Sequence, residues 1–401
     1  MKELLDEAKK INEDIIRWRR YFHENAETHN NLPKTTAYVM ARLKEMGYEP
    51  EEICQSGVLA TAGGKKPGKT FLVRGDMDAL PLEEQTDLDF KSKTGKMHAC
   101  GHDFHTSMLL GAAKLLKDHE NEIEGSVKLM FQPAEETLIG AKSMVEAGIL
   151  ENPKVDAAMM IHVFSGMPLP EGTVVFPGPG AVSATSDWFK INIKGKGGHG
   201  AMPETTIDPL NAAAHIHLAL QEINAREIDP SKTIVITVGE MHGGTTGNII
   251  PDTAFMQGTI RTFDDDVRKT AKSRLIEISE GIGNTFRCKV EVELFNACPS
   301  VINNKDLSNS IKSYTSELLG PHTVMDMVAI TGGTQRMNGS EDFAFVSEKT
   351  AATFVGMSAS VEKDGVVYPQ HHPKVIFDER ILPVGAAVYA NAAIEWLKEH
   401  K

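Results

Sequence analysis

Residues 126–163 read SVKLMFQPAEETLIGAKSMVEAGILENPKVDAAMMIHV and decide the fold class. The runs at 126–132 and 157–163 are short and apolar, as buried strands are, and the segment at 139–147 between them is predicted to be helical. A strand, a helix and a second strand in this order predict two parallel strands joined by a crossover helix. We therefore expect an α/β fold, with a mixed, mostly parallel sheet covered by helices on both faces.

The chain before this stretch predicts further elements of the same fold. Apolar residues at helical spacing predict an amphipathic helix over 4–22 and a second helix beginning near Pro33. Two β-type runs, 58–61 and 70–74, flank the turn GGKKPGK, so we expect a hairpin or neighbouring strands. A further helix is predicted from about residue 106 to residue 118.

A second domain is predicted inside the first. The loop at 167–184 has the densest Pro and Gly content of the chain, and the pattern after it reads strand, helix, strand, strand, helix, strand. This order is typical of a small ferredoxin-like sheet. We expect an inserted α+β domain at 186–297 that interrupts an α/β domain made of 1–185 and 298–401.

Composition excludes several classes of protein. The 401 residues include 42 Lys+Arg and 55 Asp+Glu, a formal charge of -13, which argues against nucleic acid or an anionic membrane as the main partner. Four scattered cysteines are too few for a disulfide scaffold. The charged N-terminus does not resemble a signal peptide, and no apolar run reaches the roughly 18 residues that span a bilayer. We expect a cytoplasmic protein.

The stretch HACGHDFH (98–105) contains three His, a Cys and an Asp in eight positions, a density of ligands that suits a transition metal. Clustered surface histidines, with Cys100 as a small buried residue, are the alternative. A further pair of carboxylates, Asp76 and Asp78 of VRGDMDALP, leaves a predicted strand end. They are candidates for orienting a His ligand, although Asp is also common in turns.

Other candidates follow the predicted strands. Glu135 and Glu136 come directly after the strand VKLMFQ, at the edge where α/β sheets bind ligands. Adjacent side chains point in different directions, so one can bind metal while the other faces substrate. His162 ends the next strand, and His371 and His372 lie in QHHPKVIFDE. The alternatives are a solvated turn for the Glu pair and a core residue for His162.

Ten motifs, in one order over nearly the whole chain, then resemble a known family. They are RGDMDALP, HACGHDFHT, FQPAEE, GAKSMVEAG, IHV, GKGGHGAMPE, GNIIPDTA, GTIRTF, GSEDFAF and HHPKVIFDE. The chain resembles the aminoacylase/carboxypeptidase metallohydrolases, and in particular the amidohydrolase branch with hippurate hydrolases and auxin-conjugate hydrolases. The resemblance implies a metallopeptidase-like domain with an inserted lid and dimerisation domain.

The resemblance also implies site residues. The general base is Glu135, and Asp78 orients the site. Cys100 stands where dinuclear relatives carry a bridging aspartate, and His372 matches a variable position. The implied cofactor is one or two divalent ions of Zn, Mn, Co or Ni. The implied metal ligands are Cys100, His102, Glu136, His162 and His371.

In the inserted domain, the resemblance implies that His199 reaches the active site of a partner subunit and stabilises the oxyanion, which makes the protein a homodimer. Asn248 and Arg261 are implied to bind the carboxylate of the substrate. One departure concerns HENAE, where Ala26 replaces the proline of the family's His-x-x-Pro-Glu segment. We expect this change to affect the preferred acyl group.

The predicted reaction is metal-dependent cleavage of the amide bond of an N-acyl amino acid, which gives a carboxylic acid and a free amino acid. Two alternatives keep the same site: a dipeptidase, and a deacetylase of an N-acetylated amino-acid intermediate. A third is an inactive homologue that only binds a carboxylate. That alternative predicts the loss of a metal ligand or of the base, and all of them are present.

Overall fold

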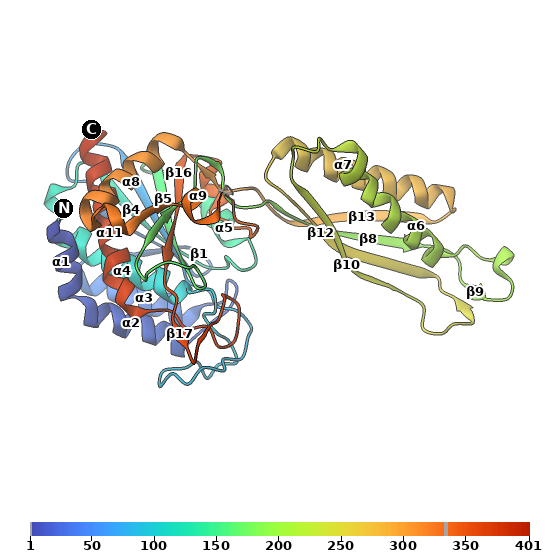
Figure 1. Cartoon of the computed structure of the whole chain (residues 1–401), viewed down its shortest axis with the longest axis horizontal. Coiled ribbons are helices and arrows are strands. Elements are labelled where there is room, and N and C mark those ends of the chain that lie inside the picture. The colour runs from blue at the N-terminus through green and yellow to red at the C-terminus, as the bar shows by residue number, and fades with distance from the viewer. Residues whose placement is uncertain (1, 333–335) are drawn as a thin grey trace. The chain divides into compact units, whose positions relative to one another are not determined.

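The computed structural model describes residues 2–332 and 336–401, which form two compact units (Figure 1). Unit 1 contains Met1–Val182, Val301–Arg336 and Glu341–Lys401, and unit 2 contains Ser183–Ser300 and Met337–Ser340. The four residues Met337–Ser340 come from far along the chain, and the sequence did not predict that they belong to unit 2.

Unit 1 is built on an eight-stranded mixed sheet with the order β1-β2-β4-β3-β5-β16-β6-β15. The strands are β1 (Glu51–Cys54), β2 (Gly57–Gly63), β3 (Thr70–Asp76), β4 (Ser126–Gln132), β5 (Ala157–Phe164), β6 (Val174–Phe176), β15 (Val324–Asp326) and β16 (Ala351–Ser358). The central strands β4, β3, β5 and β16 run parallel to their neighbours within this set. The expected α/β fold with a mostly parallel sheet is confirmed, and four strands end along the same edge of the sheet.

The strands expected at 58–61 and 70–74 are β2 and β3, and the prediction that they are neighbours is wrong. β4 lies between them, antiparallel to β2 and parallel to β3. Every residue of β4 is buried, as a central strand requires, whereas β2 keeps partly exposed positions. The connecting turn passes over the start of β4, where the amide of Gly64 donates to the carbonyl of Gly125 (2.7 Å).

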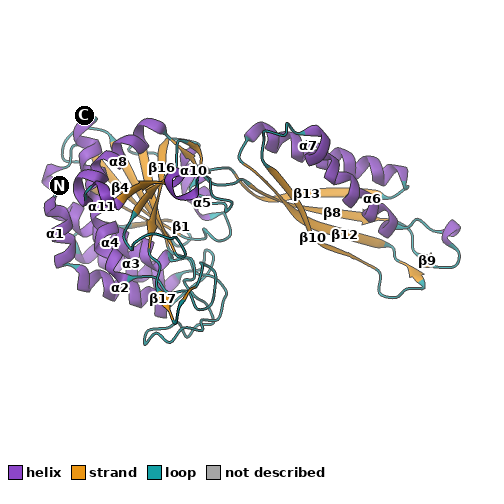
Figure 2. Cartoon of the chain, viewed as in Figure 1, coloured by secondary structure: helices purple, strands orange, loops and turns teal. Residues whose placement is uncertain are grey.

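Helices cover both faces of this sheet (Figure 2). They are α1 (Lys2–Lys10), α2 (Asn12–Glu24), α3 (Pro33–Glu45), α4 (His102–Asp118), α5 (Gly140–Glu146), α8 (Lys305–Leu319), α9 (Met327–Thr331), α10 (Ala344–Ser347) and α11 (Leu382–Glu399). α11 is fixed to the sheet by Tyr389, which donates to the carbonyl of Arg74 (2.7 Å) and accepts from the amide of Ile161 (2.8 Å). The single helix expected over 4–22 is two helices that meet at Ile11.

The start of α4 is set by a glycine. Gly101 has a φ of 89°, and a Cβ at this position would lie 2.4 Å from Cγ2 of Val163 in β5. Only glycine permits this close approach in the left-handed conformation. The helix therefore begins at His102, four residues before the predicted start, and the HACGHDFH segment lies against the end of β5.

Unit 2 has a four-stranded antiparallel sheet with the order β10-β12-β8-β13. Its elements are β8 (Ser186–Lys194), α6 (Pro209–Glu222), β10 (Ile234–Gly243), β12 (Thr253–Thr262), α7 (Asp265–Thr285) and β13 (Lys289–Cys298). Their order along the chain is the predicted one. Alternate residues of β8 and β12 are buried in a core shared with α6 and α7. Among the residues described, no helix of either unit is long and apolar enough to cross a bilayer.

Candidate active site

The carboxyl edge of the sheet in unit 1 brings together the seven site residues predicted for this unit. They come from the segments after β3 and β4, the end of β5, the start of α4 and the loop before α11: Asp78, Cys100, His102, Glu135, Glu136, His162 and His371. Residues 293 positions apart in the sequence therefore lie in one place, as expected for an edge at which parallel strands end.

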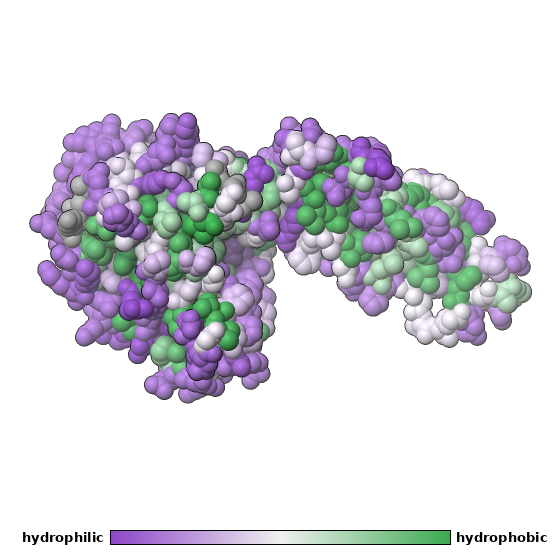
Figure 3. Space-filling model, viewed as in Figure 1, coloured by the Kyte–Doolittle hydropathy of each residue, from purple (hydrophilic) through white to green (hydrophobic). Residues whose placement is uncertain are grey.

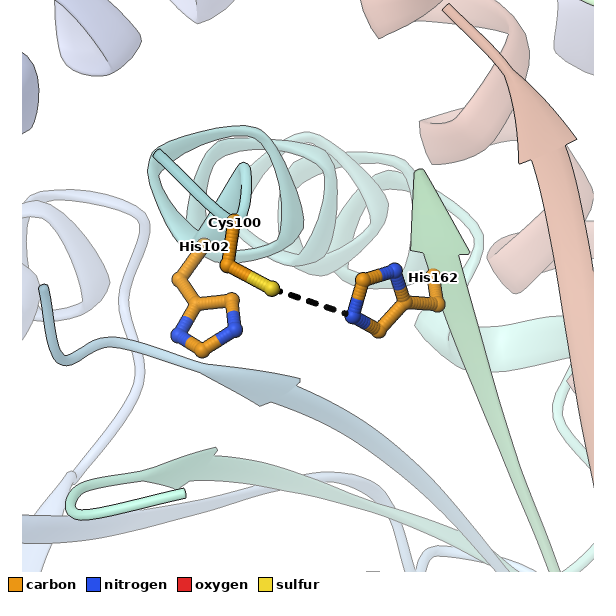
Figure 4. A group of neighbouring side chains, drawn as sticks. All are labelled: Cys100, His102 and His162. Atoms are coloured by element: carbon orange, nitrogen blue, oxygen red, sulfur yellow. Dashed lines mark hydrogen bonds between the residues drawn. The ribbon is translucent and has the colours of Figure 1, made fainter. Parts of the chain in front are cut away.

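The predicted metal ligands form two overlapping groups. In the first, the ligand atoms of Cys100, His102 and His162 lie within 4.8 Å of one another (Figure 4). Sγ of Cys100 is 3.6 Å from Nε2 of His162. The second group joins Cys100 to Glu136 and His371, whose Oε1 and Nε2 atoms are 3.7 Å apart. Because Cys100 belongs to both groups, the geometry suits a thiolate shared by two ions.

Hydrogen bonds leave ligand atoms of these residues available. Nδ1 of His102 donates to the carbonyl of Asp78 (2.8 Å), and Nδ1 of His162 donates to the carbonyl of Val163 (2.7 Å), so each ring keeps the lone pair on Nε2. Among the described residues, Nε2 of His102 and Oε1 of Glu136 are buried without a hydrogen-bond partner. A divalent ion would satisfy both atoms, and a mixture of thiolate, imidazole and carboxylate suits a transition metal.

Asp78 holds two parts of the site at once. Its carboxylate accepts hydrogen bonds from the amides of Glu135 (3.0 Å) and Glu136 (3.2 Å), while its carbonyl accepts from His102. The carboxylate thus fixes the turn that carries both glutamates. These contacts are compatible with the orienting role that the resemblance implies for Asp78.

Glu135 has the surroundings of a general base. The residue is buried, and its Oε2 lies 3.9 Å from Nε2 of His102. Burial, and then the facing carboxylates of Glu341 and Glu136, raise the pKa of Glu135 well above its usual range. A raised pKa makes the carboxylate a stronger base, as a general base requires.

A buried arginine network supports the site, and sequence reasoning missed it. Arg74 contacts Asp76 (2.7 Å), Gln132 (2.7 Å), Glu341 (2.8 Å) and Asp342 (3.2 Å). Although burial opposes ionisation, the guanidinium holds the pKa of Asp76 well below its usual range. Glu341 and Asp342 both lie in the motif GSEDFAF. The sequence shows this motif, but it does not indicate that Arg74 is its partner.

A second ionic cluster supports the segment HACGHDFH (98–105). Asp103 accepts from Nδ1 of His23 (2.8 Å) and pairs with Arg19 (2.8 Å), so α2 holds the first turn of α4. Asp378 and Glu379, which end the stretch QHHPKVIFDE, pair with arginines rather than with the ligand histidines.

The loop that departs from the family pattern borders the site. The carbonyl of Glu27 accepts from the amide of Ala79 (2.7 Å), and the carbonyl of His29 accepts from the amide of Ala134 (3.0 Å). Residues 27–29 therefore lie against the two turns that carry Asp78 and Glu135. The replaced position, Ala26, is fully buried beneath this loop.

The three predicted residues of unit 2 lie at two ends of its sheet. The short strands β9 (Gly198–His199) and β11 (Ile249–Ile250) pair with each other and place His199 close to Asn248, whose carbonyl accepts from the amide of Gly200 (2.9 Å). This pair lies beyond the end of the sheet where β12 begins at Thr253.

Arg261 lies at the opposite end of the same sheet. It is eight residues beyond Thr253, which corresponds to roughly 27 Å along an extended strand. Its Nη1 donates to the hydroxyl of Ser340, one of the late residues that belong to unit 2. Within one copy of unit 2, Arg261 and the His199–Asn248 pair are therefore too far apart to bind the same small carboxylate.

The pKa of Glu136 predicts how metal binding depends on pH. Burial raises this pKa to about 7, with His102 opposing the shift and Asp78 and Asp76 adding to it. The carboxyl group is protonated below that pH, so a metal ion must displace one more proton there than above pH 7. We expect the affinity for Zn²⁺, measured by chelator competition between pH 5.5 and 8.5, to fall as the pH is lowered. For each pH unit, the decrease in affinity should be about tenfold larger below pH 7 than above it. Glu136→Gln should lack this break, and equal slopes in both proteins would contradict the assignment.

The chain is similar to known proteins over nearly its whole length. The sequence profile of Peptidase family M20/M25/M40 matches residues 72–395. Thermostable carboxypeptidase 1 of Saccharolobus solfataricus is 39% identical over 99% of this chain and 98% of its own. IAA-amino acid hydrolase ILR1-like 4 of Arabidopsis thaliana is 38% identical over 97% of this chain and 88% of its own. The crystal structure of the Bacillus subtilis YXEP protein, titled a dinuclear metal-binding peptidase from the M20 family, has a TM-score of 0.80 and 33% identity, covering 97% and 99% of the two chains.

Proposed function

The chain belongs to peptidase family M20/M25/M40, and from this premise we propose that it is a metal-dependent hydrolase that cleaves the amide bond of N-acyl amino acids. One observation carries the proposal. A buried carboxylate, Glu135, stands beside two groups of metal ligands that share Cys100. The expected products are a carboxylic acid and a free amino acid.

The residues of unit 1 divide the chemistry between them. When bound, one or two divalent ions would supply an activated water and polarise the scissile carbonyl. Glu135 takes a proton from the attacking water and returns it to the departing amine. Asp78 keeps Glu135 in place through the backbone of its turn. The metal is proposed to be Zn, Mn, Co or Ni, since thiolate and imidazole ligands suit these ions.

We assign substrate recognition to two chains. Arg261 carries a planar guanidinium group, which suits the carboxylate in the amino-acid part of the substrate. The partner subunit contributes His199, which stabilises the oxyanion, and Asn248, which binds the carboxylate of the substrate. The separation of roughly 27 Å along β12 supports this division, because one copy of unit 2 cannot bring both ends to a single substrate.

A homodimer through unit 2 is supported by its surface. β10 is an edge strand and therefore has backbone groups that can pair with a second copy. Four large apolar side chains of β10 and α6 are exposed: Leu210, Leu218, Val235 and Met241. Figure 3 shows apolar patches on the surface of this unit.

Complementation tests the shared site. We expect Glu135→Gln and His199→Ala chains, each inactive alone, to regain activity when they are co-expressed, because one site of the heterodimer then has Glu135 from one chain and His199 from the other. Random pairing predicts roughly a quarter of wild-type activity. If each chain used its own His199, every site in the mixture would be defective, and the absence of recovered activity would contradict the proposal.

Arg261 is expected to act on substrate affinity. Arg261→Lys keeps the charge but loses the paired hydrogen bonds, and a charge-assisted bond contributes about 1.5–3 kcal/mol. We expect KM to rise about 10–100-fold with little change in kcat, measured on an N-acyl amino acid. The matched control is Arg274→Lys, a partly exposed arginine of α7 that pairs with Glu227. An effect of the same size in both variants would exclude a specific role for Arg261.

The class of substrate is tested by a panel of N-acyl amino acids, N-acetyl amino acids and dipeptides, with detection of the released amine. Fastest turnover of N-acyl amino acids supports the proposal, whereas preference for acetylated substrates or dipeptides selects one of its alternatives. Residues 27–29 border the turns of the site, so we assign acyl preference to this loop. We also propose a cytoplasmic location, in keeping with four cysteines that form no disulfide within the described residues.

A further inference from the structure

One histidine of the HACGHDFH segment has no role in the proposed mechanism. His105 lies in the first turn of α4 and is completely buried. One ring nitrogen, Nδ1, is 2.5 Å from Oδ1 of Asp76 at the end of β3. The other, Nε2, accepts a hydrogen bond from the amide of Val163 in β5 (2.9 Å). The ring therefore joins the ends of two parallel strands.

These two contacts fix the protonation of the ring. A backbone amide can only donate, so Nε2 must carry the lone pair and Nδ1 must carry the proton that is donated to Asp76. Neither nitrogen of His105 is then available for a metal ion. His105, Asp76 and His102 are close enough to form a metal-binding group by distance alone, but the hydrogen bonds of His105 exclude it as a ligand in this arrangement.

The Asp76 side of the connection is rigid. Oδ2 of Asp76 accepts from Arg74 (2.7 Å), and its carbonyl accepts from the hydroxyl of Thr106 (2.7 Å). A Cβ at Gly75 would lie 2.8 Å from the carbonyl oxygen of His105, so β3 packs directly on the first turn of α4. All of these groups are buried. Asp76 thus provides a fixed anchor for the ring.

The other side of the connection leads to a metal ligand. Val163 follows His162, and the carbonyl of Val163 accepts from Nδ1 of His162 (2.7 Å). The rings of His105 and His162 are also in edge-to-face contact, with centroids 4.6 Å apart. His105 therefore holds the amide of the residue whose carbonyl orients His162, and it packs against the ligand ring itself.

We propose that His105 is a positioning residue that fixes His162 for metal binding by linking Val163 to the Asp76–Arg74 pair. This inference rests on the proposed metal site. Groups that orient a ligand from behind typically affect metal affinity or activity 10–100-fold when they are replaced. The proposed role depends on the hydrogen bond that His105 accepts from Val163. Variants can therefore distinguish this hydrogen bond from the packing of the ring.

Two variants make this separation. His105→Gln places an amide oxygen near the position of Nε2 and keeps an acceptor for Val163, whereas His105→Asn is shorter and keeps only the donor toward Asp76. We expect His105→Asn to bind Zn²⁺ about 10–100-fold more weakly than wild type in chelator competition, and His105→Gln to recover most of that loss. The visible absorption of the Co²⁺-loaded proteins should change in the same order, since it reports ligand geometry without any substrate.

The control is His162→Gln, which removes the ligand itself. Thermal unfolding of all metal-free variants checks that they fold. Wild-type affinity and spectrum in His105→Asn, with weakened binding in His162→Gln, would overturn this inference alone. Equal losses in both His105 variants, as large as that of His162→Gln, would make His105 a ligand and also overturn it. If His162→Gln binds metal as wild type does, the proposed metal site is wrong and the inference falls with it.

Discussion

Replacing Glu135 by glutamine is expected to lower kcat by about 10²–10⁴-fold while the protein keeps its metal. Glutamine has nearly the same size but cannot take a proton from water. Glu135 lies close to His102 and Glu136, but the two ligand groups that share Cys100 do not contain it, so the ligands of these two groups are left intact. The raised pKa of Glu135 also predicts that the rate increases as pH rises through that pKa, because only the ionised carboxylate acts as a base.

The neighbouring glutamate supplies the matched control. Glu136→Gln differs from Glu135→Gln by one position in the same turn, yet it removes a predicted ligand. Metal content by elemental analysis and kcat should therefore separate the two variants: Glu135→Gln loses turnover only, and Glu136→Gln loses metal as well. Loss of metal in Glu135→Gln, or turnover near that of wild type, would reverse the assignment of base and ligand.

Removing the metal with a chelator is expected to lower activity by at least about 10³-fold, since stabilisation of developing charge by a metal ion contributes several kcal/mol. Returning Zn²⁺, Mn²⁺, Co²⁺ or Ni²⁺ should restore activity, and the ion that restores it most fully identifies the preferred metal. Stability should change too. An ion present at 1,000 times its dissociation constant stabilises the folded state by about 4 kcal/mol.

Cys100→Ala provides the control for this experiment. The thiol belongs to both ligand groups, so its removal should weaken binding at both. The burial of Cys100 raises the pKa of its thiol, and metal binding must therefore release a proton. We expect the chelator to lower the unfolding temperature of the wild type but to leave that of Cys100→Ala almost unchanged. A chelator effect of equal size in both would place the stabilising metal elsewhere.

The sequence predicts the part of the site that follows regular strands. The apolar runs before PAEE and before His162 identify buried strands, and parallel strands place their following residues at one edge. The prediction that β2 and β3 are neighbours was wrong for a related reason. Local pattern shows that two strands exist, but the partner of each strand depends on contacts with β4, which is formed more than 50 residues later.

The supporting network was not predictable from local pattern. Arg74 meets Glu341 across 267 positions of sequence, and nothing near either residue indicates the other. His105 looked like one more ligand of the histidine-rich segment. Only the positions of Val163 and Asp76 show that both of its nitrogens are engaged.

The two ends of the sheet in unit 2 have a consequence for the dimer as a whole. A single β-sheet carries Arg261 at one end and the His199–Asn248 pair at the other. In the proposed dimer, each copy of this sheet serves its own site and that of its partner. We expect substrate bound at one site to move this sheet and thereby to change the affinity of the other site. The two sites are expected to work cooperatively, with a Hill coefficient that differs from one.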